Sequence, residues 1–200
     1  MPELLFDDPT HTYMVDGVVK PSVTQIISEF IPFPWDSEAV RRAAAFGTAL
    51  HKTLELKDAG TLGEYDTALD PWIASWDKYL ADMDRSTFKW AYVDIKSGAY
   101  MPSWDIQLAA YWKLNEKPEG DVIEGRYYSE KYGYAGTIDR IYEGTGRGII
   151  CQDVRLTPKG YKIYTAPRER GFNVFLSMLN VYHFKKEHKL LKQEVFHVRD

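Results

Sequence analysis

Asp94-Ile95-Lys96 ends a run from Phe88 to Lys96 in which apolar and polar residues alternate as in a β-strand. Gln107-Leu108-Ala109-Ala110-Tyr111 follows on a predicted helix that Ser103 caps and that extends to about Leu114. Because side chains two apart on a strand point to the same face, Asp94 and Lys96 should border one small volume. An acid that holds a divalent cation beside a lysine suits the activation of water and the neutralisation of charge on a phosphate.

The length and composition of the chain predict one well-packed domain over residues 1–200, because 200 residues with 44% hydrophobic content are too few for two comfortable domains. No apolar run approaches the ~20 residues of a membrane span, and the polar start does not resemble a signal peptide. We therefore expect a cytoplasmic protein without membrane partners. Cys151 is the single cysteine, which excludes disulfides within the chain and a four-cysteine iron–sulfur cluster.

The charge of the chain is unevenly distributed around its net value of −4. Residues 151–200 contain ten Lys/Arg and five Asp/Glu, whereas residues 1–150 contain fifteen and twenty-four. The basic C-terminal quarter could provide part of a phosphate track for a nucleic acid. A solvated basic helix explains the same charges equally well.

The order of predicted elements indicates an α/β (mixed α+β) fold, with a central mixed β-sheet flanked by helices. Residues 1–60 should form an N-terminal hairpin, 4–19, with its turn at Asp16-Gly17. Two helices should follow, 23–30 with Ser22 as its N-cap and a second one, capped by Asp36 or Ser37, to about 57. Residues 86–165 should form the sheet core, with further strands at 122–129, 134–143, 149–156 and 161–164. A helix starting at 70 precedes this core, and a C-terminal helix within 171–190 follows it.

Two further residues are candidates for chemistry. His51 ends Gly47-Thr48-Ala49-Leu50-His51, where glycine permits close approach of another backbone; a lone helical histidine usually only packs. Asp139 lies in the apolar strand 134–143, where a carboxylate is costly to bury unless it is paired or bound to a metal. A buried salt bridge with Arg140 or Arg126 is the simpler explanation for Asp139.

Taken together, these motifs resemble the PD-(D/E)xK nuclease superfamily, in particular its RecB-like, phage-type exonuclease branch and the similar mitochondrial genome-maintenance exonucleases. The resemblance implies a restriction-endonuclease-like core and a role for each matching residue. Asp139 and Asp94 would be catalytic metal ligands, and the Ile95 carbonyl and His51 would complete the ligand set. Lys96 would position water or phosphate. Contacts to the site or substrate would come from Gln107, Tyr111 and, as a lesser candidate, Glu124.

The order of the motifs departs from that of the family. There the Gly-x-x-Asp strand comes before the acid-x-Lys strand, whereas here Asp139 follows Asp94 and Lys96. A competing interpretation restores the family order by using Asp153-Val154-Arg155 as the second motif. We disfavour it because the very high pKa of arginine makes Arg155 a poor substitute for lysine, so Arg155 should contribute to DNA binding at most.

The function implied by the resemblance is that of a metal-dependent DNA nuclease. It would be an exonuclease of phage-type recombination or repair that uses Mg²⁺ or Mn²⁺ and acts on single-stranded DNA or duplex ends. A recombination or single-strand-annealing protein is a further expected partner. The alternative is an inactive nucleic-acid-binding or assembly protein that keeps the nuclease fold.

Overall fold

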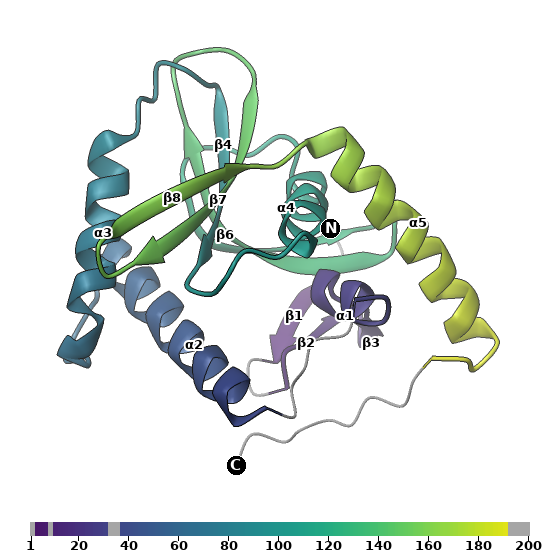
Figure 1. Cartoon of the computed structure of the whole chain (residues 1–200). Helices are drawn as coiled ribbons and strands as arrows, with labels where there is room; N and C mark the ends of the chain where they lie inside the picture. The colour runs from purple at the N-terminus through teal and green to yellow at the C-terminus, as the bar shows by residue number, and fades with distance from the viewer. Residues whose placement is uncertain (1–2, 8–9, 32–36, 192–200) are drawn as a thin grey trace.

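The computed structural model describes residues 3–7, 10–31 and 37–191, and its centre is a five-stranded sheet with the strand order β5-β6-β4-β7-β8 (Figure 1). The sheet is mixed because β4 runs parallel to β7, whereas the other neighbouring strands are antiparallel. The prediction of a mixed α/β fold is therefore confirmed. The strands are β4 (Trp90–Lys96), β5 (Val122–Ser129), β6 (Tyr134–Glu143), β7 (Ile149–Thr157) and β8 (Gly160–Thr165).

The middle position belongs to β4, although it is the first of these strands in the chain. Its sequence explains this position, since Ala91 to Ile95 are all buried and a strand covered on both faces belongs inside a sheet. The strand β4 pairs with β6 on one side and with β7 on the other. The Asp94 strand thus lies between the Asp139 strand and the Asp153 strand.

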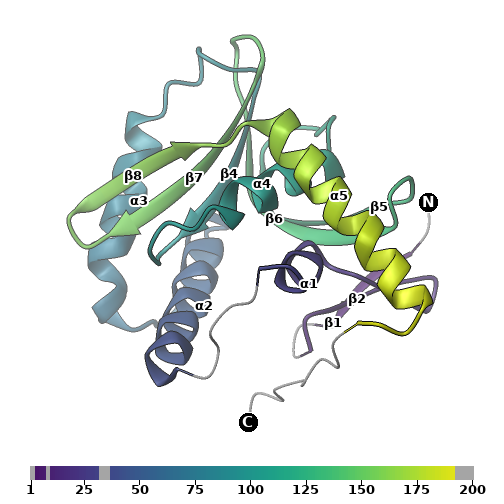
Figure 2. The same cartoon turned by 45° about the vertical axis from the view of Figure 1, so that its right-hand side comes forward.

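Two hydrophobic clusters cover the two faces of the sheet (Figures 1 and 2). Tyr92 belongs to the cluster with α1 (Val23–Ser28), α4 (Ser103–Leu114) and α5 (Arg168–Glu187). Val93 and Ile95 belong to the cluster with α2 (Glu38–Asp58), η1 (Thr67–Leu69) and α3 (Asp70–Asp82). The alternation along β4 therefore places Asp94 and Lys96 on the α4 side of the sheet.

Most helix boundaries follow the sequence signals. Ser22 caps α1 with a full capping box to Gln25, and Pro71 lies in the first turn of α3. The prediction that Ser103 caps α4 is wrong, because Pro102 occupies the cap position and Ser103 is already helical. The C-terminal helix begins at Arg168, ahead of its predicted start. Among the described helices, none has both the length and the apolar character needed to cross a membrane.

The N-terminal region forms a separate three-stranded sheet of β1 (Leu4–Asp7), β2 (Thr12–Val15) and β3 (Val18–Lys20), rather than the simple hairpin that the sequence predicts. The predicted turn at Asp16-Gly17 is confirmed: both residues have positive φ, 49° and 75°, as a tight turn between β2 and β3 requires. The Tyr13 hydroxyl lies 2.6 Å from the Thr137 hydroxyl, so this small sheet is tied to β6 two residues before Asp139.

Candidate functional site

The predicted acids meet where β4 and β6 separate. The ladder between the two strands ends at the pair Val93–Arg140. Beyond this pair, the Ile95 N–H donates a hydrogen bond to Asp139 Oδ2 at 2.8 Å instead of to a β6 carbonyl. Asp139 therefore inserts its carboxylate beside the peptide that follows Asp94, and the two acids are brought together despite their order in the chain.

His51 reaches the same carboxylate from α2, with Nδ1 3.3 Å from Asp139 Oδ2. At Gly47 an added Cβ would lie 3.2 Å from the side-chain Oγ of Ser97, whereas the predicted close approach of another backbone is not seen among the described residues. Burial opposes charge on both groups, but their mutual attraction raises the pKa of His51 and, with the Ile95 N–H, lowers the pKa of Asp139. The charge states of His51 and Asp139 are thus coupled through this contact.

The alternative partners of Asp139 are occupied elsewhere. Arg140 points to α2, where its Nε donates to Asp58 Oδ2 at 2.9 Å. Arg126 Nη2 donates to Glu124 Oε1 at 2.6 Å. The simple interpretation of Asp139 as the salt-bridge partner of either arginine is therefore wrong.

Lys96 links Asp94 to α4. Its Nζ lies 2.6 Å from Asp94 Oδ2 and donates to Gln107 Oε1 at 3.0 Å, and Gln107 Nε2 donates to Tyr111 Oη at 2.8 Å. Burial raises the pKa of Asp94 to about 6 even though Lys96 pulls it down. The Asp94 charge in turn raises the pKa of Lys96 against the effect of burial. Gln107 and Tyr111 therefore lie beside the lysine, where the resemblance places them, and hold it in position.

Gly136 makes room for this arrangement. A Cβ built at Gly136 would lie 2.9 Å from Tyr111 Cε1 and 3.0 Å from Leu114 Cδ1. Such distances are too short for carbon atoms, so any larger residue would displace the Tyr111 ring. The glycine three residues before Asp139 thus fixes the packing of α4 on β6.

Asp153 is the residue that sequence reasoning set aside. In the parallel register it pairs with Asp94 across β4 and β7, so both side chains lie on the same face of the sheet. It is fully buried, and neither carboxylate oxygen has a hydrogen-bond partner among the described residues. Burial and the nearby Asp94 charge raise the pKa of Asp153 to about 8. Its signal in the sequence, one acid in an apolar strand, is the same signal that identified Asp139.

Glu124 lies on the other side of Asp139. It falls between the ladder pairs Ile123–Arg140 and Gly125–Ile138, which places it opposite Asp139, and its φ of 51° marks a local irregularity in β5. Its carboxyl group hydrogen-bonds that of Glu55, one helical turn after His51. Burial and this contact raise the pKa of Glu124 to about 7. Glu124 therefore borders the site, while Arg155, the remaining candidate, lies opposite Lys96 on β7.

The donor chemistry of this cluster fits a hard divalent cation. Within residues 3–7, 10–31 and 37–191, no three His, Cys, Asp or Glu side chains are already arranged around a common metal position. Asp94, Asp139 and Asp153 nevertheless bring three carboxyl groups together, with Lys96 and His51 beside them. The two oxygens of Asp153 have no hydrogen-bond partner among the described residues, which is costly for buried polar atoms. A divalent cation would be a suitable partner for such oxygens.

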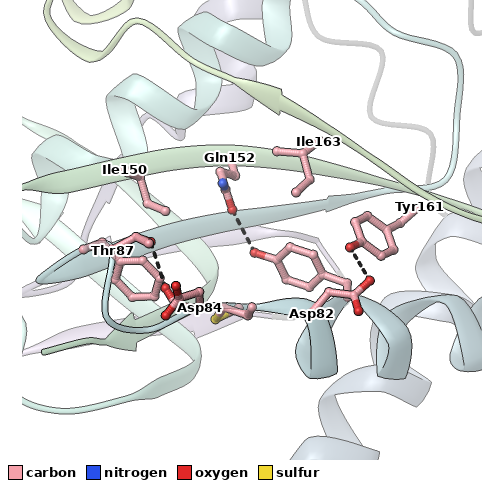
Figure 3. Close-up of a pocket in the computed structure, with 10 residues that line it drawn as sticks. Asp82, Asp84, Thr87, Ile150, Gln152, Tyr161 and Ile163 are labelled. Atoms are coloured by element: carbon pink, nitrogen blue, oxygen red, sulfur yellow. Dashed lines mark hydrogen bonds between the residues drawn. The ribbon is translucent and has the colours of Figure 1, made fainter. Parts of the chain in front are cut away.

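A small pocket of about 110 Å³ lies elsewhere, between α3 and strands β7 and β8 (Figure 3). Tyr79 donates to Gln152 at 3.0 Å and Tyr161 donates to Asp82 at 2.7 Å across it. None of the candidate residues lines this pocket. It is therefore separate from the carboxylate cluster.

Comparison of the chain with family models, curated proteins and solved structures finds no match in any of the three. The function of this chain is therefore inferred from the geometry of the carboxylate cluster and the chemistry of its residues.

Proposed function

We propose that this protein is a Mg²⁺- or Mn²⁺-dependent deoxyribonuclease, an exonuclease of the kind used in phage-type recombination or repair. One observation carries the proposal: Asp94, Lys96, Asp139 and His51, from three separate elements, converge where β4 and β6 part. A structural salt bridge needs one acid and one base, whereas here a third acid, Asp153, lies beside Asp94 with no hydrogen-bond partner among the described residues. A cluster of carboxyl groups with an unpartnered member supports the proposal of a cation site.

The residues of the chain would divide the work as follows. Asp94, Asp139, His51 and the Ile95 carbonyl would hold the metal, and a bound divalent ion supplies a more acidic water and a counter-charge for phosphate. Lys96, directed by Gln107, would orient the attacking water and stabilise the charge that grows on the phosphate oxygens. Tyr111 holds Gln107 in turn, so the lysine is positioned before substrate arrives.

The test is metal-dependent cleavage of end-labelled DNA by the purified chain, compared with Asp139→Asn. We expect cleavage with Mn²⁺ or Mg²⁺, none with EDTA, and none for Asp139→Asn under any condition. Glu64→Gln, which removes one charge in an exposed loop, should behave as the wild type.

Thermal unfolding provides the second measurement. Because a ligand that binds only the folded state stabilises it, Mn²⁺ should raise the midpoint for the wild type and much less for Asp139→Asn. A wild-type protein that neither cleaves DNA nor gains stability from Mn²⁺ would refute the nuclease proposal. It would favour a protein that binds nucleic acid without cutting it.

A further inference from the structure

A row of cations extends from the candidate site to the edge of the sheet. Strands β4, β7 and β8 lie side by side, with β8 at the edge of the sheet (Figure 2). In their registers Lys96 on β4 pairs with Arg155 on β7, and Arg155 pairs with Lys162 on β8. Residues directly opposite on neighbouring strands point to the same face, so the three side chains lie in one row. At about 4.8 Å between strands, the row extends about 10 Å from Lys96.

The outer two cations are not neutralised by acids. Arg155 and Lys162 form no ion pair with any residue that the structure describes. Arg155 Nε is buried without a hydrogen-bond partner among the same residues, and Lys162 is exposed. Because a buried guanidinium nitrogen without a partner is costly, the row is suited to an anion that approaches from solvent.

Three aromatic rings lie beside the cations, those of Tyr164, Tyr100 and Trp104, and we call them the aromatic step. Tyr164 pairs with Asp153 in the β7–β8 register, and the Tyr100 ring stacks on Tyr164 with centroids 4.8 Å apart and an interplanar angle of 23°. Trp104 contacts Tyr100 edge-on at 5.5 Å, and Lys96 Nζ lies 5.5 Å from the centre of the Trp104 ring. The step therefore adjoins the lysine of the candidate site.

Tyr100 contacts two aromatic rings and remains open to solvent. It is 42% exposed, whereas Trp104 is 6% exposed. Tyr164 stacks against the Tyr100 ring, and the exposed fraction leaves part of that ring available to a ligand. An exposed aromatic ring next to a row of cations matches the two surfaces of a nucleotide, a flat base and a charged phosphate.

We infer that the β7–β8 edge binds one unpaired nucleic-acid strand, with phosphates along Lys96, Arg155 and Lys162 and a base stacked on Tyr100. This inference rests on the proposed function, since it describes how substrate reaches the same site, and it assigns the substrate class as single-stranded. A duplex does not fit the step as well, because its bases present no free π-face except at an end.

The test of the aromatic step is fluorescence anisotropy in EDTA, where no cleavage occurs, with a labelled single-stranded oligodeoxynucleotide. Tyr100→Ala should weaken binding about tenfold, in the range for loss of one base–aromatic stack, and Tyr100→Phe should restore it. Tyr65→Ala is the matched control, because Tyr65 is similarly exposed at 39% and lies in the loop before η1. A fully abasic strand of the same length should bind wild type and Tyr100→Ala equally.

The test of the cation row is the salt dependence of the same binding. Arg155→Gln and Lys162→Gln should each reduce the slope of log affinity against log salt by about 0.7, with the abasic strand as well. Lys117→Gln, in the exposed loop after α4, should leave the slope unchanged.

Two outcomes overturn the inference. In the first, a duplex binds as tightly as the single strand, and Tyr100→Ala does not weaken that binding. In the second, the salt slopes of Arg155→Gln and Lys162→Gln equal that of Lys117→Gln. The result is separable from the nuclease proposal. If the wild type does not cleave DNA but binds single strands with the expected effects of Tyr100→Ala and of the two cation variants, only the nuclease proposal is refuted. If it cleaves DNA without these effects on binding, only the inferred strand-binding surface is refuted.

Discussion

Strands β4 and β7 carry the same short pattern, Asp94-Ile95-Lys96 and Asp153-Val154-Arg155, side by side and in parallel register. The two acids nevertheless have different surroundings. Asp94 lies 2.6 Å from Lys96, and the peptide after it is bound by Asp139. Asp153 is fully buried, and its oxygens have no hydrogen-bond partner among the described residues. A three-residue pattern therefore does not define a site, because the surroundings of its acid also depend on the base of the motif and on the neighbouring strands.

The difference follows from position in the sheet. The strand β4 borders β6, which brings Asp139 and, through it, His51, whereas β7 borders β8, which brings Tyr164 opposite Asp153. The base of each motif differs too. Lys96 forms an ion pair with Asp94 of its own motif and donates a hydrogen bond to Gln107, whereas Arg155 forms no ion pair with a described residue. We therefore expect the β4 motif to carry chemistry and the β7 motif to support binding.

The largest expected effect comes from neutralising the two acids separately. Asp94→Asn should reduce metal-dependent cleavage at least about 10³-fold, the upper end of the cost of removing one preorganised group from a reaction site. Asp153→Asn should retain activity within about tenfold, because Asp153 does not belong to the proposed set of metal ligands. Single-turnover cleavage of end-labelled DNA measures both. Equal losses in the two variants would show that the β7 acid is a metal ligand as well.

The second comparison removes the two bases. Lys96→Ala should lower the cleavage rate at saturating DNA about 10²-fold, because the lysine faces the reacting phosphate. Arg155→Ala should leave that rate nearly unchanged and weaken substrate binding less than about tenfold. Steady-state kinetics over a range of DNA concentrations separate the two effects. A wild-type rate in Lys96→Ala together with a lost rate in Arg155→Ala would reverse the assignment.

The third comparison concerns His51 on α2, which contacts Asp139 beside the β4 motif. His51→Ala should raise the Mn²⁺ concentration needed for half-maximal cleavage about tenfold or more. Its effect on the stability of the metal-free protein should be smaller and limited to the lost contact with Asp139, because the imidazole is 36% exposed. Metal titrations of activity, with urea unfolding in EDTA, measure both quantities. Unchanged metal dependence with a large loss of metal-free stability would make His51 a packing residue.

Much of this arrangement could be predicted from local signals. The acid in the apolar strand 134–143, the two-residue spacing of Asp94 and Lys96 and the four-residue spacing of Gln107 and Tyr111 each identify residues that the structure brings together. The capping box at Ser22 and the turn at Asp16-Gly17 were equally local. Signals within a few residues of the chain therefore identified most of the cluster.

What could not be predicted depends on strand order. Periodicity does not say which strands become neighbours, so the placement of β4 between β6 and β7 was open, and with it the register of Asp94 with Asp153. Asp153 gave the same signal as Asp139 and was set aside because Arg155 is a poor lysine substitute. The type of base at position 155 says nothing about where the Asp153 carboxyl group lies in the sheet.

The last comparison concerns the stability of the metal-free protein. Burial and the Asp94 charge raise the pKa of Asp153 from 3.8 to about 8, so the folded state keeps this proton at a pH where the unfolded state has lost it. The stability contributed by the protonated carboxyl is therefore present below about pH 4 and is lost as the pH rises towards 8. Asp153→Asn does not ionise, so in EDTA it should lose less stability between pH 5 and pH 8.5 than the wild type, by about 1–3 kcal/mol. Urea unfolding at several pH values measures this difference, with Glu64→Gln as the control for one removed charge. Parallel curves for the wild type and Asp153→Asn would mean that Asp153 ionises in the folded protein as it does in the unfolded chain, and the contrast between the acids of β4 and β7 would then disappear.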